Sequence, residues 1–375
     1  MTMKLLYYVG TGSNKFGGLE KFNICLFKLL KAEGWEIVVV YRRPIVNGPF
    51  KSFLDENKIP YRWLYDTFAI TGESKLTNAL RLAKIVSEYK PDLIHYNFGN
   101  LYDIALTRFR SPFQHFKAVY TAHCHVNLKS RYLRIVFGFI TPFVRKIFCV
   151  SKAINEEFVK HLNSKKSQVL YLGVPENKND RQVCRRKYGF ADDEIIITNI
   201  AYHDPIKGVD ILIKAADYLK NTLGVNNFRV IQIGGSPIKD AAENLKKLLV
   251  EVSLGKNFEM WGLRDDVESI MAATDVYCQP SRSEGIPLSL MEAGMASVPV
   301  VATRVGGIPE VAFNGENAFL CESEKYEEIG QRLNELISDS LKRERMGRKG
   351  RQITSEKFNI EKQAASLVEI YKEIK

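Results

Sequence analysis

The sequence predicts an α/β protein with two domains, each built on a parallel sheet. Short apolar runs rich in β-branched residues recur along the 375-residue chain, and helical patterns separate them, as is typical of parallel sheets. A chain of this length can bury two cores. The pattern breaks near residues 173–190 into a polar stretch, PENKNDRQ. We therefore expect a first domain over 1–175, a second over 176–355, and a closing helix over 356–375 that packs back toward the first domain.

The apolar runs are the expected strands. Five lie before the break, at 5–9, 36–41, 93–96, 118–121 and 147–150, and four lie after it, at 195–200, 230–233, 276–279 and 298–302. Ligands bind beyond the carboxyl ends of parallel strands, so we expect function in the loops after these runs and in the cleft between the domains. The closing helix is amphipathic, and its apolar face comprises Phe358, Ile360, Ala364, Leu367, Ile370 and Tyr371.

The composition excludes several classes of protein. No apolar stretch reaches the roughly 18 residues that an ordinary membrane span needs. The opening MTMKLLYYVG has no basic leader or cleavage site and predicts a first strand instead of a signal peptide. The six cysteines form no C-x-x-C pair, which favours reduced, buried thiols over a zinc ribbon or a disulfide framework. We expect a cytoplasmic protein.

The formal net charge of +11 lies in the first half of the chain. Residues 1–180 carry +13 and residues 181–375 carry −2, and residues 101–150 hold eight basic side chains against one acidic. This asymmetry favours an anionic partner for the first half, whether a lipid surface, a phosphorylated acceptor or nucleic acid. The alternative is a solvated basic surface.

Within that half, residues 129–146 set an apolar run between basic flanks. The run is too short to span a bilayer but suits the interface of an anionic membrane. Packing against the sheet is the alternative, and Pro142 would end such a helix early.

Two carboxylates mark the loop after the run at 276–279. Glu284 directly precedes Gly285-Ile286-Pro287, and Glu292 follows eight residues later in an apolar run. A helix that begins near Pro287 presents free N–H groups, which bind anions. The pattern predicts a diphosphate at this helix end and hydroxyl groups on both carboxylates. The alternative is two surface glutamates, which helix starts also favour.

The residues around this loop resemble a known family. Three stretches carry the likeness, Trp261–Val267, Met271–Pro287 and Pro299–Glu310, and Glu284 and Glu292 fall on the E-x7-E pattern of retaining family 4 glycosyltransferases. A weaker resemblance covers nearly the whole chain. The resemblance implies the GT-B fold, two Rossmann-like domains that face each other across a cleft. The first would bind the acceptor and the second the nucleotide sugar.

The resemblance also implies roles in the second domain. Glu284 would contact hydroxyls of the donor sugar, Glu292 the ribose, and Lys207 the leaving diphosphate; the alternative for Lys207 is an exposed loop lysine. The backbone that approaches the sugar and the diphosphate would be Gly285, Ile286, Pro287 and Leu288.

The chain departs from the family just before Lys207. The family places an arginine five or six residues upstream, where this sequence has Ala201 and Tyr202. Either Tyr202 or His203 takes part of that role by hydrogen bonding, or Arg282 supplies the cation.

In the first domain the resemblance implies roles for Gly17, Gly18 and His123. The two glycines match a loop that faces donor phosphates and acceptor; the sequence fails as a dinucleotide fingerprint, because Lys15 stands where that motif needs glycine. His123 matches a histidine near the reacting sugar, and the alternative is a satisfied core histidine. A zinc site at His123-Cys124-His125 is disfavoured, because adjacent residues on an extended chain point to opposite faces.

We therefore expect a retaining glycosyltransferase that moves a sugar from a nucleotide sugar, by default a UDP-sugar, to a glycan or lipid-linked acceptor in surface polysaccharide biosynthesis. We expect no cofactor and no metal, since the chain has no D-x-D tripeptide. Peripheral contact with the inner face of an anionic cell membrane is a further expectation. The alternatives are a nucleotide-sugar epimerase of the same fold and a basic membrane- or nucleic-acid-binding module, although no nucleic-acid signature is present.

Overall fold

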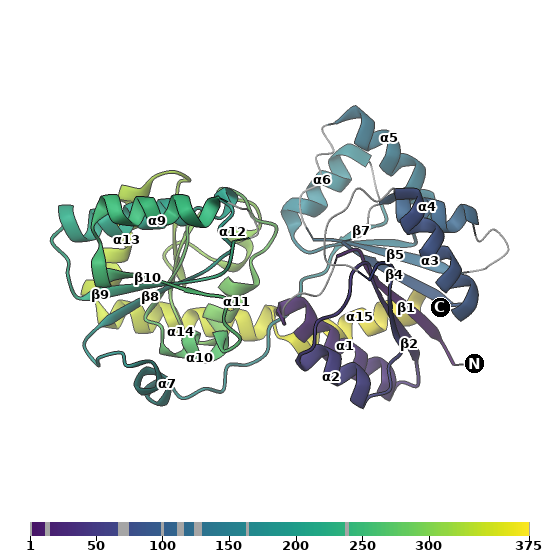
Figure 1. The fold of residues 1–375 in the computed structure, drawn as a ribbon, viewed down its shortest axis with the longest axis horizontal. Helices are drawn as coiled ribbons and strands as arrows, with labels where there is room; N and C mark the ends of the chain where they lie inside the picture. Colours follow the sequence, from purple (N-terminus) through teal and green to yellow (C-terminus); the bar gives the residue numbers. More distant parts are fainter. Residues whose placement is uncertain are drawn as a thin grey trace. The chain divides into compact units, whose positions relative to one another are not determined.

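The protein is described by a computed structural model covering residues 2–11, 16–66, 75–98, 101–110, 116–123, 130–162, 165–236 and 240–374. The chain divides into two compact units. The first unit comprises Met1–Gly173 and Ile360–Lys375, and the second comprises Val174–Asn359. Each unit is one parallel sheet with helices packed on it (Figure 1).

The first unit contains a seven-stranded parallel sheet in the order β3-β2-β1-β4-β5-β6-β7. Its strands are β1 Lys4–Val9, β2 Glu36–Tyr41, β3 Tyr61–Trp63, β4 Leu93–Asn97, β5 Lys117–Ala122, β6 Lys146–Cys149 and β7 Ser167–Val169. Its helices are α1 Gly18–Ala32, α2 Pro49–Glu56, α3 Lys75–Tyr89, α4 Leu101–Arg110, α5 Arg131–Ile140, α6 Lys152–Leu162 and α15 Ile360–Ile374, with a 3₁₀ turn η1 at Thr141–Phe143.

The second unit contains a six-stranded parallel sheet in the order β10-β9-β8-β11-β12-β13. Its strands are β8 Ile195–Ile200, β9 Phe228–Ile233, β10 Phe258–Gly262, β11 Val276–Gln279, β12 Val300–Thr303 and β13 Ala318–Cys321. Its helices are α7 Arg181–Tyr188, α8 Val209–Asp217, α9 Ala241–Val252, α10 Val267–Ala273, α11 Leu288–Met295, α12 Ile308–Val311, α13 Tyr326–Ser338 and α14 Ser340–Lys357, with short turns η2 Pro205–Lys207, η3 Tyr218–Thr222 and η4 Gly255–Asn257. The predicted fold class, two parallel α/β domains, is confirmed.

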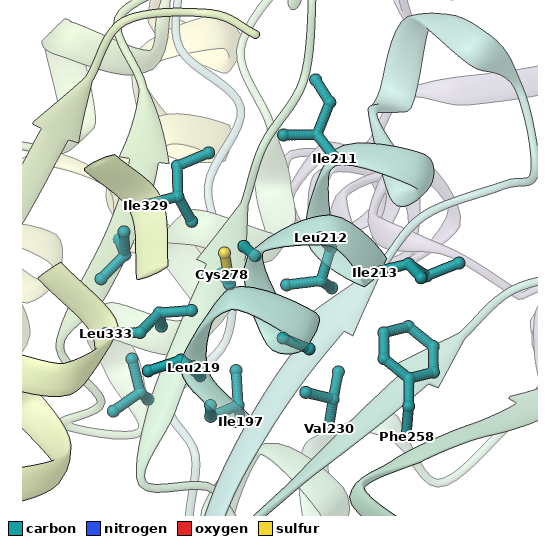
Figure 2. Close-up of a cluster of buried hydrophobic side chains, with 14 of the residues drawn as sticks. Ile197, Ile211, Leu212, Ile213, Leu219, Val230, Phe258, Cys278, Ile329 and Leu333 are labelled. Atoms are coloured by element: carbon teal, nitrogen blue, oxygen red, sulfur yellow. The ribbon is translucent and has the colours of Figure 1, made fainter. Parts of the chain in front are cut away.

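The core of the second unit follows the period-2 alternation of its strands. On one face, Ile197 and Val230 pack against Leu212 of α8 and Leu333 of α13 (Figure 2). The neighbouring strand residues, such as Ile196, point to the opposite face and pack against α7 and α10. Both faces are apolar, as expected for parallel strands that are covered by helices on both sides.

All nine expected strands are present, with ends that differ by at most two residues. Four strands were not predicted, namely β3, β7, β10 and β13. Each of them lies at an edge of its sheet.

The closing segment differs from the single helix that the sequence predicted. Helix α14 continues to Lys357, and α15 begins only at Ile360. Phe358 leaves the helical region with φ −127°, and Asn359 forms a parallel bridge with Val174. The other residues of the expected apolar face are buried, apart from Ile370, which is half-buried. Val368, which was not expected on this face, is buried.

Helix α15 is part of the core of the first unit. The Tyr371 hydroxyl hydrogen-bonds to Nδ1 of His95 on β4, and the other ring nitrogen of His95 lies 2.6 Å from Thr121 Oγ1. Lys117 Nζ donates to the carbonyl of Ile374 at 2.7 Å. Burial lowers the pKa of His95 to about 3, so the ring is neutral at physiological pH. A buried polar chain thus joins α15 to β4 and β5.

We predict that Tyr371→Phe destabilises the first unit by about 1–3 kcal/mol, because one buried nitrogen of His95 loses its partner. Urea unfolding followed by circular dichroism measures the loss. The matched control is Tyr61→Phe, which removes a hydrogen bond to Asp55 on the surface. Equal losses in the two variants would show that the buried contact contributes nothing special.

Candidate functional site

Polar side chains of the second unit converge beyond the carboxyl ends of β8, β11 and β12. At their centre is Glu284, in the loop between β11 and α11, and its side chain is only 6% exposed. Both carboxylate oxygens contact the Lys207 ammonium, Oε1 at 2.9 Å and Oε2 at 2.8 Å. The interpretation of Glu284 as an exposed helix-start residue is therefore wrong.

The carboxylate is also held from behind by neutral donors. Ser281 Oγ donates to Glu284 Oε1 at 2.7 Å, and Gln279 Nε2 donates to the same oxygen at 3.0 Å. The Tyr277 hydroxyl donates to Gln279 Oε1, which fixes the amide so that its N–H group faces Glu284. Burial raises the pKa of Tyr277 and keeps this hydroxyl protonated. The sequence analysis did not identify Gln279 or Ser281 as site residues, although both stand at the strand end where such residues gather.

Local turn geometry brings Lys207 to this carboxylate. Asp204 Oδ1 accepts from the backbone N–H of Ile206 at 3.0 Å and caps the turn η2 that ends at Lys207. Gly208 follows with φ +66°, and a Cβ atom there would lie 2.0 Å from the carbonyl oxygen of Pro280. Only glycine fits both the left-handed backbone and this close approach. The described contacts with Glu284 use two of the three ammonium N–H donors of Lys207.

A second glycine supports the loop from the β12 side. Gly306 has φ +53°, and a Cβ atom there would lie 1.8 Å from the carbonyl oxygen of Glu284. The backbone N–H of Gly307 donates to the Gly285 carbonyl at 3.0 Å. The Gly306-Gly307 turn therefore rests directly on the Glu284-Gly285 backbone and fixes its position.

Helix α11 begins immediately after this loop. Pro287 is the N-cap residue, with φ −79° and ψ 117°. The first helical residue is therefore Leu288, one residue after the expected start near Pro287. A proline side chain offers no cap to the backbone N–H groups of the first turn, which leaves the helix start suited to an anion. Ile286 is buried, while Glu292 lies half-buried in the second turn of α11.

Arg282 is held by carboxylates of its own unit. Its guanidinium forms a bidentate pair with Asp210, with both N–O distances at 2.8 Å, and also pairs with Glu324. Hydrogen bonding to Asp210 and Glu324 raises the pKa of Arg282 further above its usual value. Arg282 thus ties the loop to α8, and its role as a donor-binding cation stays a prediction.

Tyr202 and His203 follow β8. His203 is buried, and Gln232 Oε1 accepts from its Nε2 at 2.9 Å, because the Gln232 amide N–H₂ group donates to the carbonyls of Ala201 and Ile233. Tyr202 is half-buried. Hydrogen bonding of the donor by either residue stays a prediction.

In the first unit, Gly17, Gly18 and His123 lie beyond the carboxyl ends of strands. Gly17 is the N-cap of α1, and its N–H donates to Glu20 Oε2 at 3.0 Å. Gly18 is the first residue of α1. His123 follows β5, with Nε2 3.0 Å from Asn97 Oδ1. Cys124 and His125, the other members of the disfavoured zinc triplet, lie outside the described residues.

Known families match both halves of the chain. Residues 180–353 match the model described as Glycosyl transferases group 1, and residues 16–178 match Glycosyltransferase Family 4. An uncharacterised glycosyltransferase of Methanocaldococcus jannaschii is 30% identical over 312 residues, which is 81% of this chain and 82% of that protein. The chain belongs to glycosyltransferase family 4. The predicted family is confirmed.

Other relatives of this glycosyltransferase carry more specific names. An Escherichia coli UDP-Gal:α-D-GlcNAc-diphosphoundecaprenol α-1,3-galactosyltransferase is 23% identical over 373 residues, covering 94% of this chain and 93% of that protein. The crystal structure of Anabaena HepE in complex with UDP and glucose superposes with a TM-score of 0.81 at 22% identity, covering 99% of this chain and 100% of that chain. The glycosyltransferase therefore has the GT-B fold.

We predict that Gly306→Ala destabilises the second unit more than Gly315→Ala does. Both positions have positive φ, so either substitution strains the backbone by about 1–2 kcal/mol. A Cβ atom at Gly315 meets nothing within 4 Å, whereas at Gly306 it collides with the Glu284 carbonyl. We expect an additional loss of about 1–3 kcal/mol for Gly306→Ala in thermal unfolding. Identical melting temperatures would contradict the close packing of this turn on the Glu284 loop.

Proposed function

We propose that the protein is a retaining glycosyltransferase that uses a nucleotide sugar, by default a UDP-sugar. The ion pair between the half-buried Lys207 and the buried Glu284, just before α11, carries this proposal. It places an ammonium with a spare N–H donor beside a helix start suited to an anion. An anionic leaving group such as a diphosphate matches that combination.

In the proposed reaction the bond between the anomeric carbon and the diphosphate oxygen breaks, and a bond to the acceptor oxygen forms on the same face. The departing oxygen takes the acceptor proton. Lys207 and the first-turn N–H groups of α11 stabilise the developing charge more in the transition state than in the ground state, which is what accelerates the reaction. This arrangement needs no metal ion.

Glu284 has one oxygen suited to the sugar. Three donors contact Oε1, namely Lys207, Ser281 and Gln279, whereas Lys207 is the described partner of Oε2. A carboxylate has about four lone-pair positions, so Oε2 retains capacity for a hydroxyl of the donor sugar. We assign Glu292 to the ribose. The remaining roles are proposed as the sequence analysis gave them. A role near the reacting sugar is proposed for His123, and contacts with the donor are proposed for Gly17, Gly18, Tyr202, His203 and Arg282.

We propose a glycan or lipid-linked acceptor in surface polysaccharide synthesis. The Escherichia coli relative named above acts on a diphosphoundecaprenol-linked sugar according to its name, which supports an acceptor of this class.

We predict that Lys207→Ala lowers turnover by about 100-fold or more, as loss of a group that stabilises transition-state charge does. Thermal-shift screening against UDP, GDP, ADP and their sugar conjugates first identifies the donor, because a ligand of the folded state raises the melting temperature. Glu292→Ala should abolish that shift. Lys246→Ala, at an exposed lysine of α9, is the matched control.

Three outcomes would count against this site. Turnover that survives both Lys207→Ala and Glu284→Ala in folded protein would refute the assigned roles. Conversion of the donor alone into an isomer would favour the epimerase. No shift with any nucleotide would remove the donor proposal.

We further propose peripheral contact with an anionic membrane through α5 and η1. Phe139 is 72% exposed, Ile135 52% and Phe143 39%, while Phe137 and Ile140 of the same helix are buried. The exposed apolar side chains stand among exposed arginines, Arg131, Arg134 and Arg145. Such a face suits a bilayer interface that carries anionic lipid. Within the described ranges, no helix is both long and apolar enough to cross a bilayer.

We predict that Ile135→Ser with Phe139→Ser weakens flotation with phosphatidylglycerol vesicles by about tenfold, because two apolar side chains leave the interface. The matched control is Val250→Ser with Leu341→Ser, two side chains that are 78% and 76% exposed in the second unit. Raising the salt concentration should release the wild type. Flotation that is equal in both double variants, or that ignores salt, would contradict contact through α5.

A further inference from the structure

His123 has two neighbours that no comparison assigns a role. Asn97 is the last residue of β4, and Phe98 follows it. Asn97 is paired in register with Thr121 of β5, and His123 lies two residues beyond Thr121. Since side chains two residues apart share a face of a sheet, Asn97 and His123 meet at the carboxyl end of these strands.

The contact with Asn97 decides which nitrogen of His123 carries the proton. Nε2 of His123 lies 3.0 Å from Asn97 Oδ1. An amide oxygen only accepts, so Nε2 is the protonated nitrogen and Nδ1 keeps its lone pair. Nδ2 of the same amide is buried and has no hydrogen-bond partner among the described residues.

Asn97 is itself rigidly placed. It is 1% exposed, and its carbonyl accepts from the N–H of Gly10 at 2.7 Å. On one side of its side chain is His123, and on the other is Tyr7, whose hydroxyl donates to Asn23 at 2.7 Å. Burial and the contact of its backbone with Gly10 therefore fix the position of the Asn97 side chain.

Phe98 fixes the plane of the imidazole. The two rings stack with centroids 3.9 Å apart and planes 10° apart. Phe98 adopts φ +50°, a left-handed conformation that costs a non-glycine residue about 1 kcal/mol or more. The ring is 40% exposed, so burial of Phe98 itself does not account for this conformation. The stacking on His123 is the contact that it secures.

We propose that Asn97 and Phe98 are positioning residues that hold His123 as a neutral hydrogen-bond acceptor, with Nδ1 presented to a hydroxyl group of the sugar or of the acceptor. Asn97 sets the tautomer and Phe98 sets the ring plane. Burial lowers the pKa of His123 to about 3, in agreement with a neutral ring. The role of the hydroxyl ligand rests on the proposed glycosyl transfer, whereas the tautomer does not.

The consequence is a preference in ligand chemistry. A neutral imidazole with a free Nδ1 accepts a hydrogen bond and offers no positive charge to a phosphate. At this position the protein recognises an O–H group that donates a hydrogen bond to His123. A diphosphate oxygen has no proton to give and is not bound by His123.

The test is a long-range ¹H–¹⁵N spectrum of the full chain labelled with ¹⁵N-histidine, in which His123→Gln identifies the His123 signals. We expect a pyrrole-type Nε2 and a pyridine-type Nδ1 in the wild type. Asn97→Asp keeps an acceptor oxygen and should keep this pattern at mildly alkaline pH. Asn97→Leu should shift His123 toward the other tautomer and lower kcat/KM by about tenfold, the loss of one hydrogen bond.

Asn23→Leu is the matched control, because Asn23 is also buried and also contacts Tyr7. It should leave the His123 signals unchanged. A wild-type spectrum with a protonated Nδ1, or an Asn97→Leu spectrum like the wild type, overturns the inference. If Asn97→Leu does not fold, the wild-type and Asn97→Asp spectra still decide. If the spectrum shows the expected tautomer but the protein transfers no sugar, the proposed function is refuted and the inference about the tautomer stands.

Discussion

The ion pair between Lys207 and Glu284 is the interaction on which the site in the second unit depends. Burying a carboxylate lowers the stability of the folded state unless the carboxylate is paired and fully hydrogen-bonded. Removing one partner of such a buried pair destabilises the protein by more than the intact pair stabilises it. The backbone must therefore deliver the lysine accurately. Gly208 and Gly306 make this possible, because each lets two loops approach more closely than any side chain allows. In the proposed function, the third ammonium N–H of Lys207 and the start of α11 are the groups that receive the anionic leaving group.

The sequence predicted the buried strands well and the edge strands poorly, for a physical reason. A central strand is covered on both faces and reads as a continuous apolar run, as in residues 5–9 of β1 and 37–41 of β2. Two of the edge strands are not apolar: β3 reads Tyr-Arg-Trp and β7 reads Ser-Gln-Val, and their side chains are partly or largely exposed. Polarity does not explain why β13 was missed, because it reads Ala-Phe-Leu-Cys and is mostly buried. The split between α14 and α15 was also hidden, because Phe358 continues the apolar spacing of the helix while its backbone leaves it.

For the site, sequence patterns located the residues but not their partners. The E-x7-E spacing and the Lys-Gly pair identified Glu284 and Lys207 without showing that the two side chains meet. The sequence suggested that Arg282 could supply a cation to the ligand, because nothing in the sequence links it to Asp210, which is 72 residues away. Asn97 carried no signal at all, since an asparagine at a strand end is common. Contacts between distant loops depend on the register of several strands, and a local pattern does not contain that information.

The two units differ in the charge of the side chains that stand near the ends of their strands. The second unit places charged groups inside and pairs them: besides Lys207 and Glu284, the buried Arg185 holds Asp275 at 2.9 Å. In the first unit His95 and His123 are both uncharged, and most of the described lysines and arginines lie at the surface, although Glu20, Arg43 and Asp103 are buried as well. This division fits the proposed chemistry. A leaving diphosphate is stabilised by positive charge that is already in position, and the contact with Glu284 fixes the Lys207 ammonium. A hydroxyl group needs a hydrogen-bond acceptor, which a neutral imidazole provides, and an anionic membrane attracts cations that are exposed to water.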